Sequence, residues 1–204
     1  MEKLISLEDT TNYVINVDSA TEALQECTQT LNTLNIPFER FAADTTPSPP
    51  NPYGKHFVGC AMSHLTLLRA MKPHTVVFED DIVPTKDLKT EFWVPGDTDA
   101  VYLGVSNHGT IRNNNYGYAG IVLASQETSD FKRIYNMCST HAMLFLSQKY
   151  IDAAADIIER YLNQGVPCDV ALASIHKDFK ILTPNSPYFY QKDQPELTNF
   201  SLQV

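Results

Sequence analysis

The sequence predicts a single α/β domain over residues 1–204, with a mixed and mainly parallel sheet flanked by helices. A strand–helix–strand pattern opens the chain, and such a unit favours parallel strands covered by a helix. Later apolar segments alternate or run continuously like strands of a mixed or antiparallel section. No linker rich in Pro, Gly or Ser divides the 204 residues into two comparable halves. A chain of 204 residues is long enough for one substantial core, and without such a linker we expect that core to belong to one domain.

The first half of the chain alternates β-branched apolar runs with apolar stripes at helical spacing. Pro37 ends the first helical stripe, and a segment with four prolines at 45–54 indicates a surface loop. The expected elements are strands at 13–18, 38–43 and 75–78, and helices at 20–34 and from 58 to about 72.

The second half of the chain begins with the apolar run AVYLGV, which is followed by a loop rich in Asn and Gly. Its later segments continue the sheet, and a longer and a shorter helix precede the last strand. The expected elements are strands at 100–105, 119–124, 131–137, 142–146 and 179–182, and helices at 148–162 and from 167.

Composition and charge exclude several classes of protein. Hydrophobic residues make up 43% and charged residues 19% of the chain, as in folded proteins. The net charge of -9 argues against a nucleic-acid partner, since phosphate binding needs clustered Lys and Arg. The N-terminus lacks the pattern of a signal peptide, and no apolar stretch reaches the ~20 residues of a membrane span. We therefore expect a soluble, cytoplasmic protein without a membrane span.

The four cysteines are widely separated and form no CxxC pair. This spacing does not favour structural zinc or a redox dithiol. We expect reduced and mostly buried thiols.

The segment VVFEDDI at 76–82 places Glu79, Asp80 and Asp81 directly after a buried strand. Like charges about 4 Å apart repel by roughly 4 kcal/mol at an effective dielectric of ~20, so the cluster needs a cation, a proton or full solvation. Strand alternation predicts Glu79 and Asp81 on one side and Asp80 on the other. Carboxylates without Cys or His beside them suit Mg²⁺ or Mn²⁺. The alternative is a solvated strand end.

Seven short segments follow one another between residues 14 and 191: VINVD at 14–18, FERFAAD at 38–44, VGCAMSH at 58–64, VVFEDDI at 76–82, THAMLFLS at 140–147, VPCDVAL at 166–172 and TPNSPYFYQ at 183–191. Their order, and the pairing of GCxxSH with a following EDD, resemble glycosyltransferase family 25, the lipopolysaccharide and collagen glycosyltransferase group. The small size of the chain also resembles virus-encoded glycosyltransferase domains, which would place it in a host cytoplasm.

The resemblance implies a GT-A fold and a metal-dependent transfer of a sugar from a nucleotide-sugar donor, UDP-linked in our expectation. The acceptor would be a carbohydrate or a glycoprotein, and the reaction would invert the anomeric centre. In this interpretation Glu79 and Asp81 hold Mn²⁺ or Mg²⁺, which neutralises charge on the leaving diphosphate. Asp80 supports the metal site or contacts the donor sugar.

The same resemblance predicts residues around the nucleotide. The ends of the first two strands would border the nucleoside, and the start of the second helix would lie near the diphosphate, where unpaired backbone N–H groups favour anions. Ordinary strand-to-loop turns and a packed, hydrogen-bonded histidine are the alternatives. The residues concerned are Asn16, Asp18, Ala43, Asp44, Gly59, Ser63 and His64.

Further candidates come from the second half of the chain and from the loops. Asp169 is the candidate general base for an inverting reaction, and helix N-capping is its alternative. His176 would be a late metal-ligating histidine or a surface residue. Lys55 and Arg112 would meet phosphate or acceptor, or stay solvated. The 106–117 loop and the aromatic tail would bind part of the acceptor.

The sequence leaves two other function classes open. A Mg²⁺-dependent phosphoryl-transfer or receiver-like domain also places acids at strand ends, but it predicts an acidic pair on the first strand, where only Asp18 follows. A non-catalytic sugar-binding module would keep the fold without turnover.

The chain also departs from the pattern of glycosyltransferase family 25. Members of that family usually carry arginines just after the first strand, where this chain reads SATEALQECTQ.

Overall fold

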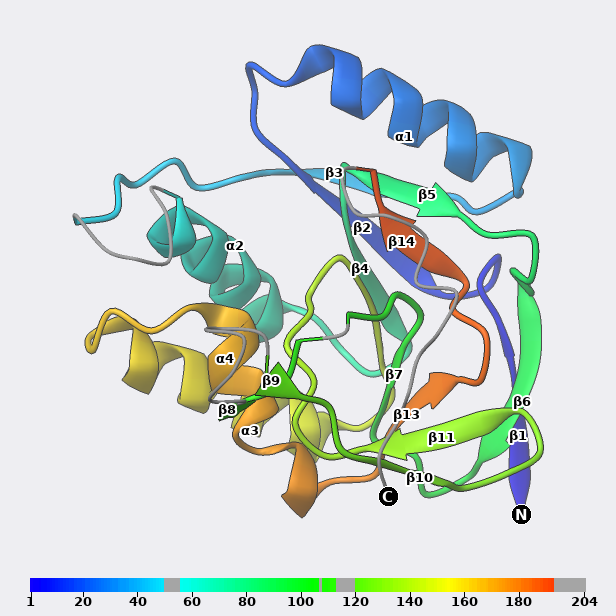
Figure 1. Cartoon of the computed structure of the whole chain (residues 1–204). Helices are drawn as coiled ribbons and strands as arrows, with labels where there is room; N and C mark the ends of the chain where they lie inside the picture. The colour runs from blue at the N-terminus through cyan, green and yellow to red at the C-terminus, as the bar shows by residue number, and fades with distance from the viewer. Residues whose placement is uncertain (50–55, 107, 113–119, 193–204) are drawn as a thin grey trace.

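The computed structural model describes residues 1–49, 56–106, 108–112 and 120–192. A large mixed sheet is flanked by helices, which confirms the predicted α/β class (Figure 1). The eight strands lie in the order β10 (Ala124–Gln126), β11 (Phe131–Ile134), β13 (Ile181–Pro184), β7 (Ala100–Tyr102), β12 (Ala142–Phe145), β4 (Thr75–Glu79), β2 (Thr11–Asn16) and β3 (Glu39–Ala42).

The sheet is less parallel than the sequence predicted. β2 pairs in parallel with β3 and β4, and β13 pairs in parallel with β7. Between these two groups lies β12, which is antiparallel to both β4 and β7. The strands β11 and β10 add antiparallel pairings at the far edge. The carboxyl ends of β3, β2 and β4 therefore share one edge of the sheet.

Helices cover both faces of the sheet (Figure 1). The helix α1 (Thr21–Thr33) packs Cys27 and Leu31 into one core, and α2 (Phe57–Ala70), α3 (Gln148–Leu162) and α4 (Cys168–Ala173) pack into the other. A 3₁₀ turn, η1 (His176–Asp178), follows α4. Because successive strand residues face opposite sides, Val76 and Phe78 join the α1 core and Val77 joins the core of α2 and α3.

The described residues also form three two-stranded pairs. They are β1 (Glu2–Ser6) with β6 (Glu91–Pro95), β5 (Ile82–Pro84) with β14 (Phe189–Gln191), and β8 (Ile111–Arg112) with β9 (Gly120–Ile121). The sequence patterns did not predict β1 or β6. The pairing of β5 with β14 brings the late aromatic segment to the acidic turn, where the Lys192 N–H donates to the Asp81 carbonyl at 2.8 Å.

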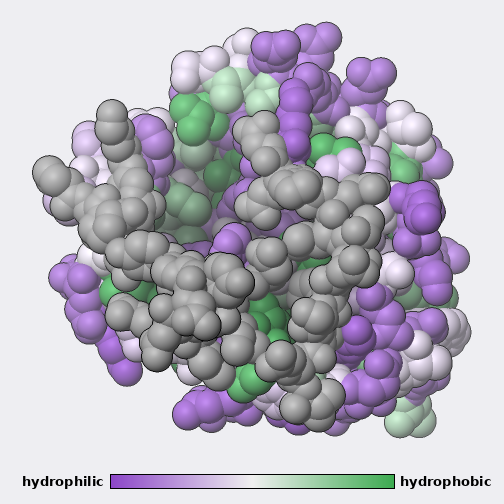
Figure 2. Space-filling view, viewed as in Figure 1, coloured by the Kyte–Doolittle hydropathy of each residue, from purple (hydrophilic) through white to green (hydrophobic). Residues whose placement is uncertain are grey.

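One face of the molecule, the one seen in Figure 1, carries hydrophilic residues around its periphery (Figure 2). The large hydrophobic side chains exposed among the described residues are Met1, Leu4, Val17 and Trp93. No described helix combines the length and the apolar character needed to cross a membrane.

Candidate functional site

A cavity of about 500 Å³ lies where the carboxyl ends of β2, β3 and β4 meet the start of α2. Ligands of open α/β sheets bind at this kind of edge. Eight of the residues predicted from the sequence line the cavity, namely Ala43, Asp44, Gly59, Ser63, His64, Glu79, Asp80 and Asp81. The other lining residues are Ile15, Val17, Ser19, Thr45, Thr46, His56 and Cys60.

All three acids line this cavity, which corrects the expectation that Asp80 turns away from Glu79 and Asp81. The strand β4 ends at Glu79, and Asp80 and Asp81 form a turn that leads into β5. Strand alternation therefore does not apply beyond Glu79. The turn gathers three carboxylates at one wall.

Asp81 carries an unsatisfied oxygen. Its Oδ2 accepts a hydrogen bond from Gln191 Nε2 at 3.1 Å, while its Oδ1 is buried without a hydrogen-bond partner among the described residues. Burial, followed by the charges of Glu79 and Asp80, raises the pKa of Asp81 to about 6. A buried, unpaired carboxylate oxygen is costly unless a proton or a cation satisfies it.

Glu79 is held by one partner on α2 and one in the segment before β12. Its Oε1 accepts from Thr140 Oγ1 at 2.7 Å and lies 3.1 Å from His64 Nε2. Although burial opposes ionisation, the hydrogen bond and charge of His64 keep the pKa of Glu79 below its ordinary value. Burial also opposes the charged form of His64, but hydrogen bonds to Cys60 and Glu79 outweigh it and raise the pKa of His64 to about 10. His64 is thus both packed and part of the cavity wall.

The described lining of this cavity contains four carboxylates and no Lys or Arg. A diphosphate entering such a wall would meet repulsion unless a cation accompanied it. Carboxylate oxygens of this kind, with Asp81 Oδ1 unpaired in the part of the chain that the structure describes, are ligands that hard divalent ions prefer, and Mn²⁺ or Mg²⁺ stays the expectation.

Asn16 and Asp18 do not line the cavity as the sequence led us to expect. The buried Asn16 donates through Nδ2 to Asp80 Oδ2 and to the Ala20 carbonyl, and its Oδ1 accepts from Arg40 Nε at 2.9 Å. Asp18 is exposed and pairs with Arg40. Asn16 therefore positions Asp80 within the acidic turn. Arg40 was not among the predicted site residues, because its place in the strand FERFA indicates none of these partners.

Gly59 and Ser63 join α2 to the loop after β3. The Asp44 N–H donates to Ser63 Oγ at 2.8 Å, and the Ser63 hydroxyl donates to the Gly59 carbonyl at 2.8 Å. A Cβ atom at Gly59 would lie 2.3 Å from the Asp44 carbonyl oxygen. The close approach of two backbones, which a glycine permits, thus shapes this corner of the cavity.

We expect Gly59→Ala to distort this corner, because the added methyl group must push the Asp44 backbone away. Overpacking of this kind costs typically about 1–3 kcal/mol. Chemical denaturation would show the loss as a lower midpoint with an unchanged slope. Thr66→Ala, at an exposed position on the same helix, is the control for a general helix effect, since it also introduces alanine. An unchanged midpoint in Gly59→Ala would contradict the packing role.

A second cavity, of about 260 Å³, adjoins the first and shares Cys60 and Glu79 with it. Asp169 lies in its wall, and the lining residues are Phe57, Cys60, Glu79, Ser106, His108, Cys138, Ser139, Thr140, Pro167, Cys168, Asp169 and Gln191. Burial, and to a smaller extent the charge of Glu79, raises the pKa of Asp169 above its ordinary value.

Asp169 is not the N-cap of α4. Pro167 occupies that position without a side-chain hydrogen bond, and Asp169 Oδ1 accepts from the Val170 N–H at 2.8 Å. The side chain lies within the first turn of the helix and reaches the second cavity. The capping alternative is therefore wrong for this residue.

The remaining sequence candidates lie elsewhere. His176 is fully buried, and its Nε2 lies 2.8 Å from the Tyr102 hydroxyl, so the expectation of surface exposure is wrong. It lines neither cavity. Lys55 falls outside the described residues, as do residues 107 and 113–117 of the loop at 106–117, and the side chain of Arg112 is not described.

All four cysteines are free, and Cys60 and Cys168 stand close together at the boundary between the two cavities. Hydrogen bonding to Cys168 is the main cause that lowers the pKa of Cys60. No local pattern predicts this contact, because the two residues lie 108 positions apart in the chain.

No protein-family model matches the chain, and no curated protein matches it. Among solved structures, the chain is similar to the CTP:phosphocholine cytidylyltransferase of Streptococcus pneumoniae, with 8% identity and a TM-score of 0.36. The similarity covers 89% of this chain and 92% of that chain. Similarity at this level identifies neither a family nor an activity. The resemblance to glycosyltransferase family 25 stays a prediction.

Proposed function

We propose that this protein is a metal-dependent glycosyltransferase that uses a nucleotide-sugar donor, with a UDP-linked sugar as the first candidate. The observation that supports this most directly is the pair of adjoining cavities that share Glu79 and Cys60. The larger cavity carries the acidic turn at a sheet edge, and the smaller one carries a carboxylate of raised pKa. A donor and an acceptor could meet at their common wall.

The larger cavity is the proposed donor site. Glu79 and Asp81 would hold the divalent ion, with Asp81 Oδ1 as the oxygen that has no hydrogen-bond partner among the described residues. Asn16 and Gln191 orient the neighbouring acids through their hydrogen bonds to Asp80 and Asp81. The bound ion would supply charge neutralisation for the leaving nucleoside diphosphate.

The smaller cavity is the proposed acceptor site, and Asp169 is the proposed general base. Its raised pKa makes its carboxylate a stronger base than an ordinary aspartate. In an inverting transfer the carboxylate would take the proton of the acceptor hydroxyl as the hydroxyl oxygen attacks the anomeric carbon, and the bond from that carbon to the nucleoside diphosphate would break, releasing the diphosphate. The acceptor would be a carbohydrate or a glycoprotein glycan.

The receiver-like or phosphoryl-transfer alternative is less well supported. Such domains need an acidic pair at the end of the first sheet strand. In this structure β2 ends at Asn16, and Asp18 pairs with Arg40 outside the cavity. The acid cluster instead belongs to one turn after β4.

A thermal-shift titration tests the donor site. UDP, GDP, CMP and ADP are each added with Mn²⁺ or with EDTA, and a metal-dependent rise in Tm is expected for one of them. A ligand at 100 times its Kd adds about 2.7 kcal/mol, which corresponds to roughly 5–10 °C in a domain of this size. If no nucleotide raises Tm with or without metal, the proposal fails.

Binding alone would not separate a transferase from a sugar-binding module. The nucleotide that shifts Tm is therefore followed as its sugar conjugates, with release of nucleoside diphosphate as the readout. Turnover that rises when an acceptor glycan is added supports transfer, because simple hydrolysis of the donor does not depend on the acceptor. Metal-dependent donor binding without any turnover across an acceptor panel would favour the module.

A further inference from the structure

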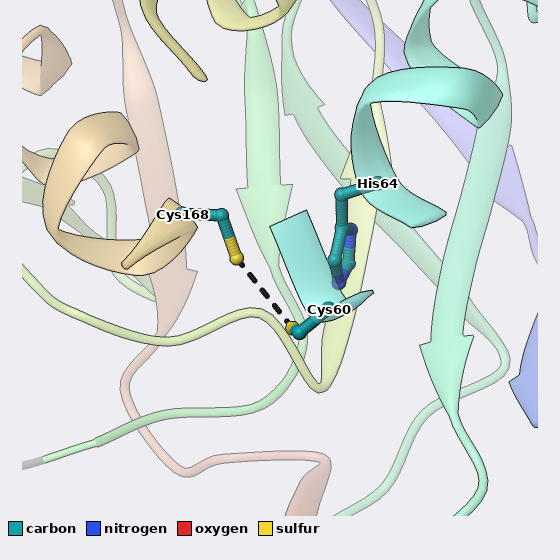
Figure 3. Close-up of side chains that lie close together, drawn as sticks. All are labelled: Cys60, His64 and Cys168. Carbon is teal, nitrogen blue, oxygen red and sulfur yellow. Dashed lines mark hydrogen bonds between the residues drawn. The ribbon is translucent and has the colours of Figure 1, made fainter. Parts of the chain in front are cut away.

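Three potential metal ligands converge at the boundary between the two cavities. Cys60 and His64 lie one turn apart on α2, and Cys168 begins α4 (Figure 3). One ligand atom from each residue lies within 4.8 Å of the other two. Among the described residues, no other group of His, Cys, Asp and Glu side chains reaches this arrangement.

The distance between the two sulfur atoms matches a shared metal ion. Two thiolates bound to one tetrahedral Zn²⁺ at about 2.3 Å each lie about 3.8 Å apart. Cys60 Sγ and Cys168 Sγ lie 3.6 Å apart, so little movement is needed. A disulfide, with a bond of about 2.05 Å, would require the sulfur atoms to approach each other by roughly 1.5 Å.

The ligand atoms of this cluster favour a different metal ion from the one that the carboxylates of the acidic turn favour. Thiolate and imidazole ligands favour zinc, whereas carboxylates favour manganese, magnesium and calcium. Glu79 Oε1, 3.1 Å from His64 Nε2, adds a negative charge beside the cluster. The three ligands are also largely shielded from solvent, as expected for a specific metal site. His64 and Cys168 are buried, and Cys60 is half-buried.

We propose that Cys60, His64 and Cys168 form a Zn²⁺ site with three protein ligands. The fourth position is open to water or to a ligand group, because the described residues add no fourth member to the cluster and Cys60 lines both cavities. Bound zinc links α2 to α4 across the wall that the cavities share. The site does not depend on the proposed glycosyltransferase activity.

Zinc uptake by the full chain tests the proposal. The protein is reduced, stripped with a chelator and desalted, and Zn²⁺ is then titrated against a chromogenic competitor. We expect one tight site per chain. Cys60→Ser and Cys168→Ser should each weaken affinity by more than the roughly 10–100-fold that loss of an outer-shell partner costs. Cys138→Ser is the matched control, since Cys138 lines the second cavity but lies outside the cluster.

Cobalt substitution reports the ligands without any variant that might fail to fold. Co²⁺ bound by the wild-type chain should show thiolate-to-cobalt charge-transfer bands and the intense visible bands of a tetrahedral site. Adding Zn²⁺ should abolish both. Asp81→Asn should leave the cobalt spectrum unchanged, which separates this site from the proposed donor-metal site.

Three results would overturn the proposal. The first is the absence of zinc uptake in competition with the chelator, and the second is uptake that both cysteine variants retain. The third is a Cys60–Cys168 disulfide that forms under diamide equally fast with and without Zn²⁺, because bound zinc must protect these thiols from oxidation. This last result would make the two cysteines a redox pair without a metal.

Discussion

Asp169→Asn is expected to lower kcat for sugar transfer by about 10²–10⁴-fold, the range that a positioned general base contributes. The amide keeps the size of the side chain but cannot accept the proton of the acceptor hydroxyl. Metal-dependent binding of the nucleotide should remain unchanged, because Asp169 lies in the second cavity and not in the wall of the first. Steady-state kinetics and the nucleotide thermal shift measure the two effects separately.

The pH profile distinguishes a base from a residue that only supports the fold. Burial raises the pKa of Asp169, so its base form is lost at a higher pH than in an ordinary aspartate. In the wild type, kcat should therefore fall at a higher pH than an ordinary aspartate would cause. In Asp169→Asn this acidic limb of the kcat profile should disappear. Asp178→Asn, an exposed acid in the following 3₁₀ turn, is the control. Full activity of Asp169→Asn would contradict the role of Asp169 as general base.

Asp81→Asn is expected to abolish the metal-dependent thermal shift and to stabilise the metal-free protein at neutral pH. Burial and the charges of Glu79 and Asp80 disfavour the ionised Asp81 carboxylate, whose pKa is raised to about 6. An amide removes that charge. After discounting for solvent exposure, the gain is about 1–3 kcal/mol, and Tm should rise by roughly 2–4 °C for each kcal/mol.

The gain should depend on pH in a defined direction. The pKa of Asp81 is higher in the folded protein, at about 6, than the ordinary value of 3.8. The folded state therefore binds the proton more tightly, and the stability that this gives is fully present below pH 3.8 and lost as the pH rises through 6. Asp81→Asn should thus exceed the wild type in stability at pH 7.5 and lose this advantage near pH 4.

Asp87→Asn is the control, since Asp87 is an exposed acid soon after the same turn. It should change neither the metal response nor the pH dependence of stability. If Asp81→Asn instead lowered the stability of the metal-free protein at neutral pH, the buried oxygen of Asp81 would have a partner other than a metal ion. If Asp81→Asn kept the Mn²⁺-dependent rise in Tm with the nucleotide, Asp81 would not be a ligand of the metal ion.

Local sequence patterns predicted most of the elements correctly. The helix at 148–162 begins and ends at the predicted residues, because Ser147 accepts from the Tyr150 N–H and the apolar stripe defines one buried face. The strand at 75–78 was also predicted, and its apolar run explains its burial. The pair of β1 with β6 was missed, because its short strands gave no signal of pairing over so long a separation.

The sequence by itself determined the α/β class and the placing of three acids at the end of a buried strand. These features follow from helix and strand periodicity, which involves residues a few positions apart. The tertiary structure decided which distant residues complete the site. Gln191 meets Asp81 across 110 residues, Cys168 meets Cys60 across 108, and Arg40 meets Asn16 across 24. Such contacts depend on how the helices and strands pack together, and local sequence patterns do not predict that packing.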